Sequence, residues 1–386
     1  MKLSFRLFTA IAVLGGASTL LLGNQSVYSQ TSPQVVASYS VLCDLTEQIA
    51  EDTVDVTCLI EAGEDPHLYS ATPADRRAIE TADLVLYGGY GFEPDIIQMV
   101  ESTDGNTPLV AVSEIAVPEP LLGAPHDHGS HSGEGHDEHD HDEHDHEHHD
   151  HEHDHEHHSS HRKAGHDDHH HEHDHDAHGE EGHGDHDGHD DHGEEGMVPD
   201  PHVWHDAENG IAMVRVIQEE LSVISPDNAD LYQANAEALI AQLTQLDTWI
   251  QQQVDTVPES QRILVTTHDA LGYYAAAYGI RIEAALESFS TEARPSAADL
   301  RELIDFVEDS NIPTVFIETT SNPGLIEAVS RETDIGISEE PLYADSLGEA
   351  GTPAATYTGM LMTNTCTIVS GLGGTCNEAA VQAFLD

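Results

Sequence analysis

The chain has 386 residues, with 73 aspartates and glutamates, 31 histidines and only 12 lysines and arginines, which gives a formal net charge of -61. Such a charge excludes nucleic acids and anionic membrane surfaces as partners, because both repel an acidic protein. The length allows two domains of ordinary size together with a long insertion.

The N-terminus has the layout of a secretory signal peptide. Basic residues precede an apolar run over residues 7–22, which is short for a membrane span. We expect cleavage near Ser29, so that residues 1–29 are removed. The first cysteine is Cys43, far from that point, which argues against a lipid anchor. No later segment reaches the roughly 18 apolar residues of a spanning helix, so we expect a periplasmic protein that is not a lipoprotein.

The four cysteines are an even number in a chain that we expect to be exported. An oxidising compartment favours disulfides, and four cysteines allow three pairings. We expect the pairs that are close in sequence, Cys43 with Cys58 and Cys366 with Cys376. Free buried thiols are the alternative.

Strands and helices alternate through the first part of the chain. We expect strands over residues 34–42, 54–60, 82–87 and 109–112, and helices over residues 44–51, 73–81 and 94–101. Alternation at this spacing predicts parallel βα units.

A tract of histidine, aspartate, glutamate and glycine interrupts this part at about residues 124–197 and holds all but four of the 31 histidines. It lacks the apolar residues that a core requires, so we expect a disordered loop. Imidazole and carboxylate groups are ligands of divalent first-row metals, and their density here indicates metal handling.

Beyond the tract, we expect a helix over residues 207–223 and a second that begins after Ser225-Pro226 and continues to about residue 254. The serine suits an N-cap and the proline a first turn. The alternation then resumes, with strands expected over residues 262–266, 282–285, 314–318 and 342–343, and helices over residues 270–278, 297–310, 324–333 and 357–370.

The predicted fold class is therefore α/β, with two βα lobes joined by one long connecting helix. The N-terminal lobe covers residues 30–224, the connecting helix 225–257 and the C-terminal lobe 258–386. Ligands of open α/β folds bind beyond the carboxyl ends of strands, so the cleft between the lobes is the expected site.

Three of the four histidines outside the tract lie in positions that fit this cleft. His67 and His268 follow predicted strands, and His202 lies in a proline-rich loop. Three imidazoles with one oxygen form a common zinc shell. Asp345 lies at another strand end and is the first candidate for the oxygen, while Glu318 is the reserve.

Four segments around these residues occur in a characteristic order: Gly63-Glu-Asp-Pro-His-Leu-Tyr, Asp200-Pro-His-Val-Trp-His-Asp, His268-Asp-Ala-Leu-Gly and Leu342-Tyr-Ala-Asp-Ser-Leu-Gly. They resemble the signature segments of the metal-binding solute-binding proteins that serve ABC importers, specifically the zinc-uptake branch with its histidine-rich loop. The resemblance runs from about residue 35 to the end of the chain.

The resemblance implies a receptor rather than an enzyme, which delivers Zn²⁺ to a membrane permease powered by an ATPase. It implies the metal ligands His67, His202, His268 and Asp345. In the manganese branch a glutamate replaces the histidine that matches His268, so the histidine here favours zinc. Arg294 stands where many relatives are acidic, and nothing in the sequence explains it. We expect a monomer.

Other interpretations stay open. The tract could make the protein a zinc buffer or metallochaperone, and the same fold also serves manganese or iron receptors. A metallohydrolase would use three histidines and an open position, but no motif here places a general base beside the site. His205 follows His202 by three residues, and we expect it to support the ligands or to lie at the surface.

Overall fold

A computed structural model describes residues 32–123 and 197–377, apart from residues 104, 287 and 293, and also residue 379. The signal peptide predicted over residues 1–29 lies outside the described residues, as does all but the last residue of the predicted insertion. The described residues on both sides of the tract belong to one compact unit, which is of mixed α/β class as predicted.

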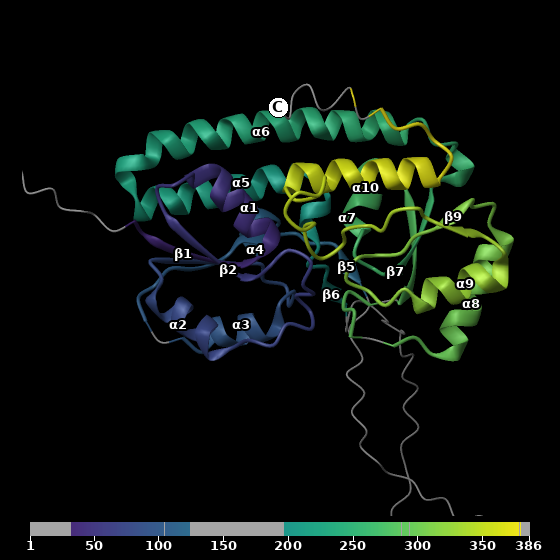
Figure 1. The fold of residues 1–386 in the computed structure, drawn as a ribbon, viewed down its shortest axis with the longest axis horizontal. Coiled ribbons are helices and arrows are strands. Elements are labelled where there is room, and N and C mark those ends of the chain that lie inside the picture. Colours follow the sequence, from purple (N-terminus) through teal and green to yellow (C-terminus); the bar gives the residue numbers. More distant parts are fainter. Residues whose placement is uncertain are drawn as a thin grey trace, which may run out of the picture. The chain divides into compact units, whose positions relative to one another are not determined.

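The first half of this unit is built on a four-stranded parallel sheet with the strand order β2-β1-β3-β4. Its strands are β1 (Gln34–Tyr39), β2 (Asp55–Ile60), β3 (Leu84–Tyr87) and β4 (Leu109–Ala111). Helices α1 (Ser40–Ala50) and α5 (Ala207–Ile224) lie on one face of the sheet, and α2 (Pro73–Thr81) and α3 (Pro94–Glu101) lie on the other, as Figure 1 shows. Short elements α4 (Val112–Ala116), β5 (Leu122–Gly123) and β6 (Val198–Pro199) complete this half.

The predicted strand over residues 34–42 is wrong at its end, because the helix α1 already begins at Ser40. Val41, Leu42 and Leu45 are fully buried, and an apolar run of this length fits a buried helix as well as a strand. The helices predicted over residues 73–81 and 94–101 are confirmed. Thr72 caps the first of them with a capping box to Asp75.

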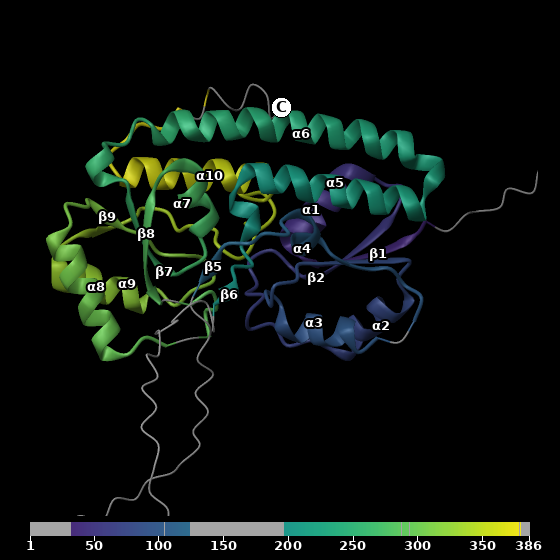
Figure 2. The same cartoon turned by 180° about the vertical axis from the view of Figure 1, so that it is seen from behind.

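The long helix α6 (Ala229–Val254) contains 26 residues, about 39 Å at ~1.5 Å per residue. It follows the turn η2 (Pro226–Asn228) and lies alongside α5 and α10 (Tyr357–Gly371), which Figure 2 shows from behind. The Tyr232 hydroxyl is 2.8 Å from that of Thr53, and Trp249 Nε1 donates to Asn377 O at 3.1 Å. The helix α6 therefore contacts parts of the fold that are distant from one another in sequence.

The half that follows α6 has two pairs of parallel strands. They are β7 (Ile263–His268) with β8 (Arg281–Leu286) and β9 (Thr314–Val315) with β10 (Gly336–Ile337). The helices are α7 (Gly272–Tyr278), α8 (Ala297–Asp309) and α9 (Gly324–Thr333). The strand predicted over residues 342–343 is reduced to one isolated bridge, between Leu342 and Glu318. The turns η1 (Val203–His205) and η3 (Glu259–Gln261) connect larger elements.

The main hydrophobic core is continuous across both halves, from Val35 in β1 through Leu243 in α6 to Ile368 in α10. A smaller core lies under α8 and α9 around Val307 and Ile326. The proposed division into lobes at residues 224 and 258 stays a prediction.

Both predicted disulfides are confirmed. Cys43–Cys58 joins α1 to β2 with a Cα–Cα distance of 5.7 Å, and Cys366–Cys376 joins α10 to the segment after it with a Cα–Cα distance of 5.2 Å. None of the described helices has the length and apolarity that crossing a membrane requires.

Candidate metal centre

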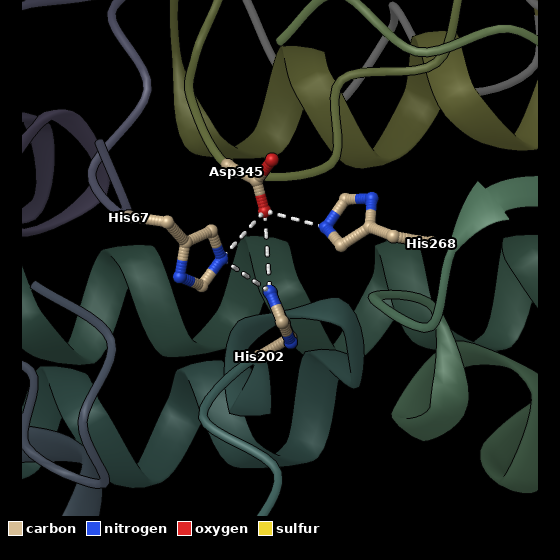
Figure 3. Close-up of side chains that lie close together, drawn as sticks. All are labelled: His67, His202, His268 and Asp345. Carbon is tan, nitrogen blue, oxygen red and sulfur yellow. Dashed lines mark hydrogen bonds and ion pairs between the residues drawn. The ribbon is translucent and has the colours of Figure 1, made fainter. Parts of the chain in front are cut away.

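The four predicted ligands come together in one buried cluster, which we call the metal quartet (Figure 3): His67, His202, His268 and Asp345. Their ligand atoms all lie within 4.8 Å of one another. His67 follows β2, His268 is the last residue of β7, and His202 lies just before η1. His67 is 8% exposed, whereas the other three are 0% exposed. His67 is therefore the most solvent-exposed member of the quartet.

One oxygen of Asp345 faces all three imidazoles. Asp345 Oδ1 lies 3.1 Å from Nε2 of His202, 3.2 Å from Nε2 of His268 and 3.5 Å from Nε2 of His67. The Nε2 atoms of His67 and His202 are 3.3 Å apart. A tetrahedral ion with bonds of about 2.0 Å has ligands about 3.3 Å apart. Four of the six pairs of ligand atoms are therefore at the spacing of a tetrahedral ion, and the other two pairs lie within 4.8 Å.

Two of the imidazoles have a carboxylate behind them. His202 Nδ1 lies 2.8 Å from Asp200 Oδ1, and His268 Nδ1 lies 2.7 Å from Glu318 Oε2. In the neutral imidazole, a carboxylate that accepts a hydrogen bond from Nδ1–H leaves the lone pair on Nε2, which points toward the other quartet members. Sequence reasoning missed the role of Asp200, although its position two residues before His202 is visible in the motif.

Glu318, the reserve candidate for the oxygen ligand, is not a member of the quartet. Besides contacting His268 Nδ1, its carboxylate accepts from Ser321 Oγ at 2.6 Å and from Thr267 N at 3.2 Å. Glu318 is 4% exposed. It therefore orients His268 from behind, and Asp345 alone supplies the quartet's oxygen.

The charges within the quartet reinforce one another. Burial alone would lower the pKa of His268, but Glu318 and Asp345 together raise it well above its usual value. Burial opposes protonation of His202 too, yet hydrogen bonds to Asp200 and Asp345 raise its pKa. Burial alone would raise the pKa of Asp345, which His268 and the imidazole hydrogen bonds lower well below its usual value. The oxygen that faces the imidazoles therefore belongs to an ionised carboxylate.

His67 differs from the other two imidazoles, because burial lowers its pKa more than Asp345 raises it. Its ring packs edge-on against Phe92, with 5.0 Å between the centroids, and Phe92 also packs against His202 at 5.6 Å. Phe92 is fully buried. An apolar wall beside the rings keeps water away and holds their orientation.

His205 is fully buried and is not at the surface. Its Nε2 donates to the backbone oxygen of Ala344 at 2.7 Å, directly before Asp345 in the chain. Burial, and then the neighbouring His202, lower the pKa of His205 to about 3. His205 is therefore a neutral support for the segment that carries the quartet's carboxylate.

The loops that carry the quartet are also joined to one another across the two halves. The contacts are Thr291 Oγ1 to Asp65 Oδ2 at 2.6 Å, Gly63 N to Ser346 Oγ at 2.8 Å, and Leu347 N to Ser40 Oγ at 3.0 Å. These hydrogen bonds link segments that precede α6 to segments that follow it. Sequence reasoning did not find them, because a hydroxyl at a loop position carries no spacing signal.

A buried set of three imidazoles and one carboxylate, contributed by segments of both halves of an α/β fold, defines a metal-binding protein. Residues 35–371 match the family described as "Zinc-uptake complex component A periplasmic" (ZnuA), and the chain belongs to this family. The family comprises metal-binding receptors of ABC importers, which work outside the cytoplasm with a permease and an ATPase and are not enzymes.

The chain is similar to relatives that are named for different metals. It is 30% identical to the manganese-binding lipoprotein MntA of Halalkalibacterium halodurans, and the 339 matched residues cover 88% of each chain. It is 27% identical over 368 residues to the zinc-binding protein TroA of Treponema pallidum, which covers 94% of this chain and 96% of that protein. The structure of the periplasmic zinc binding protein TroA has a TM-score of 0.66 at 26% identity and covers 88% of this chain and 99% of that one.

Proposed function

We propose that this chain is the zinc receptor of an ABC importer, and that it binds Zn²⁺ outside the membrane and passes the ion to the permease. The proposed ligands are His67, His202, His268 and Asp345. The observation that carries the proposal is the convergence of three imidazole Nε2 atoms and one carboxylate oxygen, with four of their six separations near those of a tetrahedral zinc shell.

The donor set supports zinc over manganese. Three neutral nitrogens and one oxygen suit zinc, whereas manganese prefers carboxylate, carbonyl and water oxygens. A manganese or iron receptor is the second candidate, and the manganese-binding relatives are what favours it. Copper and nickel accept the same atoms, so their exclusion depends on geometry and on metal supply.

We further propose that the receptor acts in the periplasm after cleavage of a signal peptide near Ser29, without a lipid anchor. Several of the relatives are named as lipoproteins, so the state of the mature N-terminus is a direct test. Mass spectrometry of the protein from its native membrane fraction and periplasm would decide between a free N-terminus and an anchored one.

Release of the ion requires that the quartet be separated. His67 and His202 precede α6 in the chain, and His268 and Asp345 follow it. The hydrogen bonds of Thr291 with Asp65 and of Ser346 with Gly63 hold the two sets of ligands together. We propose that the permease breaks these contacts and draws the later pair of ligands away from the earlier pair.

Metal titrations test the proposal. The full chain and a variant that lacks residues 126–192 are titrated separately with Zn²⁺ and Mn²⁺, alongside His268→Ala and the control Glu339→Ala, an exposed residue. We expect one tight zinc site in both the full chain and the deletion variant. His268→Ala should weaken it at least about a hundredfold, and Glu339→Ala should leave it unchanged.

Two results would contradict the proposal. Nitrogen and oxygen sites that are not selective bind zinc with higher affinity than manganese. A manganese affinity within about tenfold of the zinc affinity would therefore favour a manganese receptor. Loss of the tight site on deletion of residues 126–192 would favour a buffer that works through the tract.

A further inference from the structure

We infer that Thr320 is a specificity-determining residue of the metal site. By holding the second oxygen of Asp345, it leaves one oxygen for the ion and limits the protein shell to four ligands. The inference rests on the proposed function, because it explains why this site would favour zinc over metals that require more ligands.

The two oxygens of Asp345 have different partners. Oδ1 lies 3.1 to 3.5 Å from the three Nε2 atoms of the quartet. Oδ2 accepts a hydrogen bond from Thr320 Oγ1 at 2.5 Å. In Figure 3 the second oxygen points away from the three imidazole rings. The carboxylate is therefore oriented as a ligand through one oxygen.

Rotation of the carboxylate is the movement that Thr320 restrains. The backbone beside Asp345 is already fixed, because His205 donates to Ala344 O at 2.7 Å and Ser40 Oγ accepts from Leu347 N at 3.0 Å. Asp345 is 0% exposed, so its carboxylate is shielded from bulk solvent. A carboxylate can bind a metal through one oxygen or two, and the Thr320 hydroxyl favours the first mode.

The segment after β9 places Thr320 at this point. Glu318 forms a bridge with Leu342, and Thr319 N donates to Leu342 O at 2.9 Å. This pairing sets the segment beside the one that carries Asp345. Glu318 then supports His268, and two residues later Thr320 supports Asp345. One short segment thus orients both ligands that follow α6.

The number of oxygens that Asp345 offers affects the metals differently. Zinc is satisfied by four ligands in a tetrahedron. Manganese prefers an octahedral shell that is rich in oxygen, so a second carboxylate oxygen would stabilise manganese more than zinc. Removing the Thr320 hydroxyl should therefore shift the selectivity toward manganese.

The test compares Thr320→Val, which removes the hydroxyl at nearly the same volume, with Thr320→Ser, which keeps it. Thr319→Val is the matched control, because Thr319 is the exposed neighbour. Thr320→Ala serves as a second hydroxyl-free variant should valine disturb the fold. Dissociation constants for Zn²⁺ and Mn²⁺ are measured by competition with a chelator, and Co²⁺ is added as an optical probe, since four-coordinate cobalt absorbs visible light more strongly than five- or six-coordinate cobalt.

We expect the ratio of manganese to zinc affinity to rise about tenfold or more in the hydroxyl-free variants relative to wild type, with a weaker cobalt band. Thr320→Ser and Thr319→Val should match wild type in both measurements. An unchanged ratio, or equal weakening of both metals, would overturn the inference. The wild-type constants alone test the zinc proposal, whereas the change of ratio between variant and wild type tests Thr320, so the two can fail separately.

Discussion

Replacing Glu318 by glutamine tests how far the carboxylate behind His268 contributes to metal binding. Glu318 Oε2 accepts the Nδ1 proton of His268 at 2.7 Å, and Oε1 accepts from Thr267 N at 3.2 Å. A glutamine can satisfy only one of these donors. If its oxygen stays with Thr267, its NH₂ faces Nδ1 and favours the tautomer with the proton on Nε2. That tautomer cannot bind a metal through Nε2.

The magnitude follows from the loss of this interaction. A hydrogen bond to a charged group contributes about 1.5 to 3 kcal/mol, and loss of a partner behind a metal-ligating histidine typically weakens metal binding by about 10- to 100-fold. A hundredfold change in a dissociation constant corresponds to about 2.7 kcal/mol. We therefore expect Glu318→Gln to weaken zinc binding about 10- to 100-fold at neutral pH.

The variant should also change the pH dependence of binding. Zinc requires unprotonated imidazoles, and Glu318 and Asp345 raise the pKa of His268 well above its usual value. In the wild type, protons therefore compete with zinc up to and beyond neutral pH, and the affinity rises with pH. Without the Glu318 charge the pKa of His268 falls, so the slope between about pH 6 and 8 should become shallower.

Zinc competition titrations at several pH values provide the assay, with Glu339→Gln as a matched control at an exposed site. A dissociation constant within about threefold of wild type, together with an unchanged pH slope, would refute the argument that Glu318 orients and charges His268. A weaker dissociation constant with an unchanged slope would refute its electrostatic part alone.

Two further predictions concern stability. Burial raises the pKa of Glu93 to about 7, although Ser38 and the backbone donate hydrogen bonds to its carboxylate. The folded protein therefore keeps a proton that the unfolded chain loses, so the wild type should lose stability as the pH rises from about 4.5 to 7. Glu93→Gln, which cannot ionise, should be more stable than the wild type at pH 8 by about 3 kcal/mol. Chemical denaturation of both proteins at about pH 4 and 8 checks this, and equal pH dependence would contradict it. His205→Leu leaves the buried Ala344 oxygen without its hydrogen-bond donor, which should lower the free energy of unfolding by about 1–3 kcal/mol, whereas His205→Gln should recover part of this loss. Thermal unfolding of the metal-free proteins measures both effects. Equal stability of the leucine and glutamine variants would contradict the role of this hydrogen bond.

Much of the α/β pattern was predictable, because helices such as α2 and α3 begin at proline and are bounded by polar residues. Apart from the strand over residues 342–343, which is reduced to one bridge, the main error occurred where an apolar run fits two structures. Val41 and Leu42 continue the pattern of β1, yet they are buried on α1. The sequence pattern cannot tell a buried helix from a buried strand over such a short run.

The metal quartet was predictable through strand ends and motifs, but its supporting contacts were not. The strand-end rule places both Glu318 and Asp345 near His268, and only the geometry distinguishes them: Glu318 contacts Nδ1, whereas Asp345 faces Nε2. Thr320 had no signal at all, because its role depends on the bridge that brings Glu318 beside Leu342. Spacing along the chain identifies candidate ligands but not which atom of each faces the ion.

The helix α6 has a consequence for any attempt to divide the molecule. Its buried residues, among them Leu239, Leu243 and Leu246, belong to a core that also includes Val35 and Ile368. A fragment that ends before or begins after this helix would expose a face that is now covered, and would be prone to aggregate. Heating or denaturant should accordingly melt the two halves together, in a single step, and isolated halves should not substitute for the whole receptor.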